Sequence, residues 1–87
     1  MTITKKSAYQ NLGTWIEGKE EFDKKRNLEF CAKVHEYGSE FGINGGKISK
    51  LEIRLGNAIL ANYDRGWDKE PTEEARPLYE AIVREYN

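Results

Sequence analysis

The sequence predicts an α+β domain, in which a four-stranded antiparallel β-sheet with meander topology packs against one C-terminal α-helix. Residues 28–35 and 50–55 alternate apolar and polar side chains, which is typical of strands with one buried face. Apolar residues between 75 and 86 recur every three or four positions, which is typical of an amphipathic helix. Because 87 residues fill only one hydrophobic core, we expect a single domain over residues 13–87.

The N-terminal segment gives the weakest signal. Residues 1–12 are polar with scattered apolar positions, so we expect a flexible arm. Residues 14–22 alternate loosely and predict a first strand, with a bulge or twist at Gly18. The charged residues 23–27 then predict a turn.

The second strand, residues 28–35, carries the clearest pattern. Its apolar face holds Leu28, Phe30, Ala32 and Val34, and its polar face holds Glu29, Cys31, Lys33 and His35. The glycine-rich residues 38–46 follow, and Asn44-Gly45-Gly46 favours the positive φ values of a turn. Residues 47–55 then return as the third strand.

The turn into the fourth strand, residues 58–63, has two interpretations. A two-residue turn at Gly56-Asn57 has favoured hairpin chemistry, but it turns Ile59, Ala61 and Tyr63 toward the charged face. Its cross-strand pairs would be Leu55 with Ala58 and Ile53 with Leu60. A three-residue loop instead pairs Leu55 with Ile59, Ile53 with Ala61 and Leu51 with Tyr63. We expect the longer loop, since a slip of one residue turns every side chain to the opposite face.

The C-terminal helix is predicted from a continuous apolar stripe. Its members are Ala75, Leu78, Tyr79, Ile82, Val83 and Tyr86. Proline lacks a backbone donor and fits only the first turn of a helix, so Pro77 predicts a start near Arg76. Residues 72–76 would form an irregular lead-in.

Composition excludes several classes of protein. The chain is 38% hydrophobic and 33% charged with a formal net charge of −1, so it lacks the basic excess of nucleic-acid-binding proteins. Cys31 is the only cysteine, which excludes an intrachain disulfide and metal sites built from cysteine pairs. With no signal peptide and no apolar stretch long enough for a membrane span, we expect a cytoplasmic protein. Because so short a chain buries limited surface, a homo-oligomer would add stability.

No enzyme active site emerges, and the sequence predicts no cofactor or metal. Residues 42–49 imitate a phosphate-binding loop, but the spacing fails and the segment lies between two strands. Cys31 and His35 lie four residues apart along one strand, about 13 Å at about 3.3 Å per residue, which is too far for proton exchange. No serine lies in a glycine elbow. We therefore expect a protein that is not an enzyme, in which Cys31 and His35 are structural residues. As an alternative, His35 forms part of a ligand surface.

Two unusual clusters remain, at residues 39–47 and 63–68. If the third and fourth strands are antiparallel neighbours, both clusters lie at the same end of the sheet. The candidate partner-binding residues are Glu40, Phe41, Lys47, Tyr63, Asp64, Arg65, Trp67 and Asp68. In one interpretation Trp67 plugs the end of the core and nearby carboxylates hold Arg65. In the other, these residues form a binding surface, because Trp, Tyr and Arg are the commonest interface hot spots.

Three stretches carry a resemblance: SEFGI at 39–43, GKISKL at 46–51 and NYDRGWD at 62–68. They resemble small, functionally uncharacterised proteins found in phages and mobile elements of Gram-positive bacteria. The resemblance implies a context in which small proteins often inhibit host defence, as anti-CRISPR proteins do.

This context gives two functional hypotheses. In the first, the chain is a non-enzymatic inhibitor that occludes a host defence protein in the bacterial cytoplasm. In the alternative, an oligomer sequesters a nucleotide signal between subunits through Lys47, Arg54 and Arg65.

Overall fold

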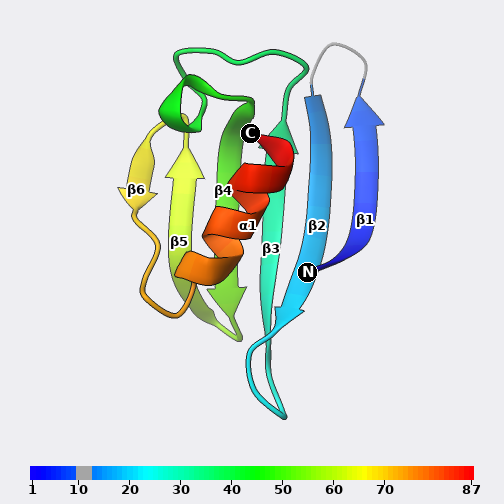
Figure 1. Ribbon diagram of the computed structural model, residues 1–87, viewed down its shortest axis with the longest axis vertical. Helices are drawn as coiled ribbons and strands as arrows, with labels where there is room; N and C mark the ends of the chain where they lie inside the picture. The colour runs from blue at the N-terminus through cyan, green and yellow to red at the C-terminus, as the bar shows by residue number, and fades with distance from the viewer. Residues whose placement is uncertain (10–12) are drawn as a thin grey trace.

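The computed structural model describes residues 1–9 and 13–87, which form one antiparallel sheet with a helix across one face (Figure 1). The predicted α+β class, antiparallel meander and single C-terminal helix are confirmed, but the strand number is wrong: the described sheet has six strands in the order β1-β2-β3-β4-β5-β6. The elements are β1 (Thr2–Tyr9), β2 (Gly13–Glu21), β3 (Asn27–Val34), the 3₁₀ turn η1 (Ile43–Gly45), β4 (Ile48–Leu55), β5 (Ala58–Asp64), β6 (Trp67–Lys69) and α1 (Arg76–Tyr86).

The first additional strand is β1, at the sheet edge where the sequence predicts a flexible arm. Its residues pair with β2 from Thr2 opposite Lys19 to Tyr9 opposite Gly13. An edge strand gains its backbone hydrogen bonds from one neighbour and needs no apolar face, and its lysines discourage pairing with further chains. Polar composition therefore does not distinguish β1 from an arm. The predicted arm boundary at residue 12 lies outside the described residues.

Gly18 lies where β1 and β2 pair irregularly. The register shifts between Ile3 and Lys5 of β1, opposite Gly18 and its neighbour Glu17, so the irregularity lies in β1. A Cβ atom on Gly18 would lie 2.6 Å from both the Phe30 ring and the Thr2 carbonyl oxygen. Glycine is thus required here by close approach, as expected where another group crowds a strand.

The second additional strand is β6, within the cluster predicted as a binding site. It pairs with β5 at the opposite edge, with Trp67 facing Tyr63. The chain reverses through Arg65, whose φ of 57° lies in the left-handed region, and the Asp64 amide donates to the Gly66 carbonyl over 2.9 Å. A strand of three residues is too short to show a period in the sequence.

The core lies between the sheet and α1. On β3, Leu28, Phe30 and Ala32 are buried and Val34 is half-buried, as the period-two pattern predicts. The helix begins at Arg76 with a proline in its first turn, which confirms the predicted start. The buried apolar residues are Ile16, Leu28, Phe30, Ala32, Ile43, Ile48, Leu51, Ile53, Ala61, Tyr63, Ala75, Leu78 and Ile82.

The hairpin between β4 and β5 combines both predicted registers. Leu55 faces Ala58 across a two-residue turn, so the predicted pairing of Leu55 with Ile59 is wrong. A register shift then leaves Leu60 as an extra residue, and the expected pairs follow beyond it: Ile53 with Ala61 and Leu51 with Tyr63. A β-bulge inserts one residue into one strand, so it satisfies both the turn chemistry and the apolar pattern.

The connection from β3 to β4 is fastened to the end of α1. Asn44 and Gly45 adopt positive φ values of 52° and 73°, as the sequence predicts, whereas Gly46 does not. The Asn87 side chain donates from Nδ2 to the Ile43 carbonyl over 2.9 Å and accepts from the Ile48 amide over 3.1 Å. One side chain thus joins the helix end to η1 and to the start of β4.

Replacing Asn87 with alanine is therefore expected to lower the free energy of unfolding by about 1–2 kcal/mol, since two partly buried hydrogen bonds are lost. Urea denaturation followed by circular dichroism measures the change. Asn27→Ala is the matched control, because Asn27 is exposed and its side chain makes no hydrogen bond to any residue that the structure describes. Equal stability of the two variants would show that the Asn87 side chain does not fasten the loop.

Candidate functional site

The two clusters singled out in the sequence meet at one end of the sheet. The Tyr63 hydroxyl donates to the Phe41 carbonyl over 2.8 Å, and the Arg65 amide donates to the Ser49 carbonyl over 2.9 Å. Antiparallel pairing of β4 and β5 produces this meeting, because the start of one strand lies beside the end of the other. We call this group the composite edge; its members are Glu40, Phe41, Lys47, Tyr63, Asp64, Arg65, Trp67 and Asp68.

Aromatic side chains of the composite edge divide into buried and exposed groups. Tyr63 is buried and closes this end of the core, whereas Trp67 is 36% exposed. The Trp67 ring lies edge-on to Tyr63 and to Tyr79 of α1, with centroid separations of 5.0 and 5.5 Å. Trp67 therefore covers the sheet edge and does not plug the core. Phe41 is 51% exposed.

Charged groups of the composite edge are only loosely paired. Asp64 lies 3.6 Å from the Arg65 Nε and 3.8 Å from the Lys50 Nζ, and all three side chains are well exposed. Exposed ion pairs of this kind are worth about 0–1 kcal/mol, so carboxylates do not hold Arg65 in place. Glu40, Lys47 and Asp68 are exposed, and none forms an ion pair within the part of the chain that the structure describes.

Within one chain, the cations of the nucleotide-sequestering hypothesis are not brought together. Lys47 precedes β4, whereas Arg54 lies near its far end beside Glu52, at 3.9 Å. Seven residues of strand separate Lys47 from Arg54, which is about 23 Å at about 3.3 Å per residue. Only Arg65 shares an end of the sheet with Lys47.

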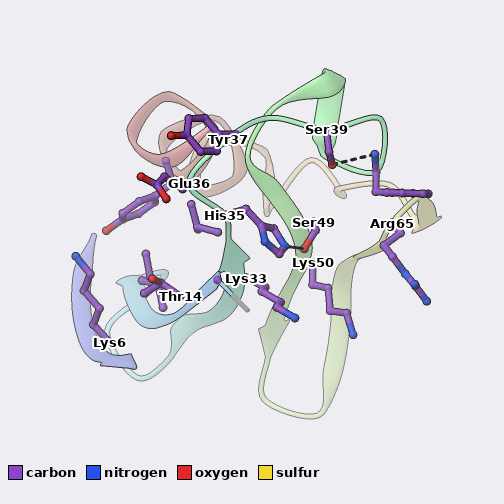
Figure 2. A pocket seen from close by; sticks show the side chains of 15 residues that line it. Lys6, Thr14, Lys33, His35, Glu36, Tyr37, Ser39, Ser49, Lys50 and Arg65 are labelled. Atoms are coloured by element: carbon purple, nitrogen blue, oxygen red, sulfur yellow. Dashed lines mark hydrogen bonds between the residues drawn. The ribbon is translucent and has the colours of Figure 1, made fainter. Parts of the chain in front are cut away.

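A hollow adjoins the composite edge and was not predicted from the sequence. Its volume is about 1060 Å³, and it lies over the ends of β1 to β4, toward the reversal at Arg65 (Figure 2). Four cations and one carboxylate line it: Lys6, Lys33, Lys50, Arg65 and Glu36. At its centre, the His35 Nε2 and the Ser49 Oγ are hydrogen-bonded at 2.7 Å.

A second β-bulge creates this histidine–serine contact. Lys33 faces Lys50 and Val34 faces Ile48, so Ser49 is an extra residue of β4. Bulges redirect side chains and are common beside functional sites. The polar face of the second predicted strand identified His35 as a possible ligand-surface residue, whereas Lys33 was not singled out. The alternation pattern does not show a bulge in the partner strand.

The candidate nucleophiles lack activating surroundings. Burial, and then the neighbouring Glu52 and Glu17, raise the pKa of the Cys31 thiol, which favours the weakly nucleophilic protonated form. For the His35–Ser49 pair, no carboxylate among the described residues hydrogen-bonds to the imidazole to orient it as a base. The arrangement is suited to holding a ligand or a partner.

Comparison with known proteins identifies a family but no activity. A family model described as a domain of unknown function, DUF7678, matches residues 14–87. No curated protein and no solved structure matches the chain. Within the described residues, no helix has the length and apolar character needed to cross a membrane. The whole composite edge lies inside the matched region, whereas β1 precedes it.

Proposed function

The chain belongs to the DUF7678 family, and from its own surface we propose that it is a non-enzymatic binding protein that recognises a partner protein through the composite edge. One observation carries the proposal: two large aromatic side chains, Phe41 and Trp67, are 51% and 36% exposed at the same end of the sheet. Interface hot spots are enriched in tryptophan and tyrosine, and aromatic residues are generally enriched in interfaces.

Both aromatic residues are held in place before any partner arrives. The Phe41 carbonyl accepts from Tyr63, and its amide donates to the Ser39 Oγ over 3.2 Å. Edge-on contacts with Tyr63 and Tyr79 restrict the Trp67 ring. Binding by preorganised groups loses less conformational entropy, so these residues suit a tight contact.

Charge around the aromatic pair fits a polar rim. Glu40, Asp64 and Asp68 are acidic, whereas Lys47 and Arg65 are basic, and all five are exposed. A rim of mixed charge favours a protein surface with complementary charges, since it selects the partner more than it adds affinity.

For the partner, we propose a bacterial defence protein that the chain occludes in the host cytoplasm. This part of the proposal is supported by the resemblance of residues 39–43, 46–51 and 62–68 to small proteins of phages and mobile elements. An anti-CRISPR or related inhibitor needs a binding surface and no active site.

The test is capture of the partner from host lysate, its identification by mass spectrometry, and titration of the purified partner. Phe41→Ala and Trp67→Ala are each expected to weaken binding by at least about 30-fold, the effect of losing one hot spot.

Phe22→Ala is the control, because Phe22 is also 36% exposed but directly follows β2, away from the composite edge. Its affinity should equal that of the unmodified chain. Unchanged binding by a double variant that retains its circular dichroism spectrum would refute the proposed surface.

A further inference from the structure

The hollow beside the composite edge concentrates positive charge in a chain that has a net charge of −1. Lys6, Lys33, Lys50 and Arg65 line it, against one lining carboxylate, Glu36. Lys6 lies in register with Ile16 and Ala32, on the face of the sheet that α1 covers, whereas Lys33 and Lys50 lie on the opposite face. Asp64 pairs with Lys50 across β4 and β5 and lies close to Arg65, so it offsets one charge of the group formed by Lys33, Lys50 and Arg65. We propose that this hollow binds a nucleotide through its phosphate groups.

The strongest support is the cross-strand pairing of two lysines. Lys33 and Lys50 are direct partners across β3 and β4, and their side chains extend in the same direction (Figure 2). Like charges in directly opposed positions destabilise a sheet. Farther along the same two strands, Glu29 faces Arg54, which is a complementary pair. A phosphate between Lys33 and Lys50 would convert their repulsion into attraction for the ligand.

Two side chains that can hydrogen-bond to a ligand lie beside these lysines. Ser49 is only 6% exposed, and the bulge at this residue brings its hydroxyl to the imidazole of His35. The pair lies at the centre of the hollow, between the lysines and the loop that follows β3 (Figure 2). Because the hydroxyl and the imidazole hold each other in position, they can hydrogen-bond to a ligand oxygen without first rearranging.

Arg65 occupies a position that another residue would fill with less strain. Its φ of 57° is a left-handed conformation, which glycine and asparagine adopt more readily than arginine. Strain retained at one residue is typical of functional sites. The Arg65 side chain is 66% exposed, so packing does not explain the choice of arginine.

The aromatic rings that line the hollow and the net charge of the chain favour a nucleotide over a nucleic-acid polymer as the ligand. Tyr37 and Phe41 also line the hollow and are 76% and 51% exposed, so a base has rings on which to stack. A nucleic-acid polymer needs an extended basic track, which a chain of net charge −1 does not provide. A compact nucleotide with several phosphate charges fits the group formed by Lys33, Lys50 and Arg65 better. The inference goes beyond partner binding, because Lys33, Lys50 and His35 lie outside the composite edge.

Calorimetric titration of the full chain with ATP, ADP, AMP and adenosine at low salt tests the proposal. Affinity is expected to rise with the number of phosphates, and adenosine is expected not to bind. Inorganic triphosphate separates the phosphate contribution from the stacking contribution: weaker binding than ATP supports a site for both. A single-stranded oligonucleotide that binds more tightly than ATP would overturn the nucleotide assignment in favour of nucleic acid.

Two variants distinguish a binding role from a structural role. Lys33→Glu is expected to weaken ATP binding by at least about tenfold, the loss of a charge-assisted contact, and to raise the thermal midpoint by relieving the lysine repulsion. Arg65→Asn is expected to weaken binding similarly while retaining or raising the thermal midpoint. Lys19→Gln, an exposed lysine of β2 outside the hollow, is the control and should leave affinity unchanged.

The absence of heat and of thermal stabilisation with every nucleotide and with triphosphate would overturn the site, as would equal losses in Lys33→Glu and Lys19→Gln. Trp67→Ala separates this outcome from failure of the partner-binding proposal, since Trp67 does not line the hollow. It should retain ATP affinity while losing the protein partner.

Discussion

Replacing Ile53 with alanine is expected to lower the free energy of unfolding by about 2–5 kcal/mol. Ile53 lies in β4 and is fully buried, with Phe30 and Ala61 as its cross-strand partners. The truncation removes buried methyl groups and leaves a cavity that strands on both sides keep from collapsing. Since domains of this size are stable by roughly 5–10 kcal/mol, much of the total would be lost. Urea denaturation followed by circular dichroism measures the change.

Ile59→Ala is the matched control, because the same substitution falls on the neighbouring strand at a side chain that is 40% exposed. Its expected cost is within about 0.5 kcal/mol. The comparison also tests the bulge at Leu60, since a three-residue loop would pair Ile59 with Leu55 and bury it. Equal losses from Ile53→Ala and Ile59→Ala would therefore contradict the bulged hairpin.

Strands and helices that bury one face were predictable from sequence, because their apolar residues recur at a regular spacing along the chain. Alternation on β3 identified Leu28 and Phe30 as core, and the three–four spacing on α1 identified Leu78 and Ile82. Pro77 fixed the helix start for an equally local reason, the missing backbone donor.

Edge strands were not predictable in this way. Backbone hydrogen bonds to one neighbour hold β1, and its sequence therefore shows neither a core face nor a period. The strand β6 exists because the chain reverses at Arg65 and Gly66, and it spans only three residues, of which Trp67 and Lys69 pair with β5. Both β1 and β6 form by pairing with a neighbouring strand, β2 or β5, so their own residues do not determine whether they become strands.

The position of the candidate site was predictable from the sequence, but the exposure and contacts of its side chains were not. Antiparallel geometry placed residues 39–47 beside residues 63–68, because it follows from chain order alone. It did not fix the exposure of Trp67, which depends on where Tyr79 of α1 lies. Nor did it show the contact of His35 with Ser49, which a one-residue bulge creates.

Three segments of the chain meet at one end of the sheet. The β3–β4 connection, the reversal at Arg65 and the C-terminal end of α1 all meet there, and Asn87 and Tyr63 hydrogen-bond to the backbone of the connection. Phe41 and Arg65 belong to this hydrogen-bonded backbone, since the Phe41 carbonyl accepts from Tyr63 and the Arg65 amide donates to Ser49. A change in this backbone should disturb binding even where no binding side chain is altered.

Gly42→Ala tests this dependence directly. A Cβ atom at residue 42 would lie 1.8 Å from the Gly46 carbonyl oxygen, and both groups belong to the backbone of the connection. The φ of Gly42 is −79°, which any residue adopts, so the effect is purely steric. We expect a loss of about 3 kcal/mol in the free energy of unfolding, at the upper end of overpacking costs, because backbone must move.

Displacement of the connection should also move Phe41, the neighbour of Gly42, and break the hydrogen bond that its carbonyl accepts from Tyr63. Gly42→Ala is therefore expected to weaken partner binding although it substitutes no side chain of the composite edge. Gly66→Ala is the control, because its Cβ would meet nothing within 4 Å. Its φ lies outside the left-handed region, so alanine should be neutral or stabilising by up to about 1 kcal/mol. If urea denaturation finds Gly42→Ala as stable as Gly66→Ala, the close approach of residues 42 and 46 does not support the composite edge.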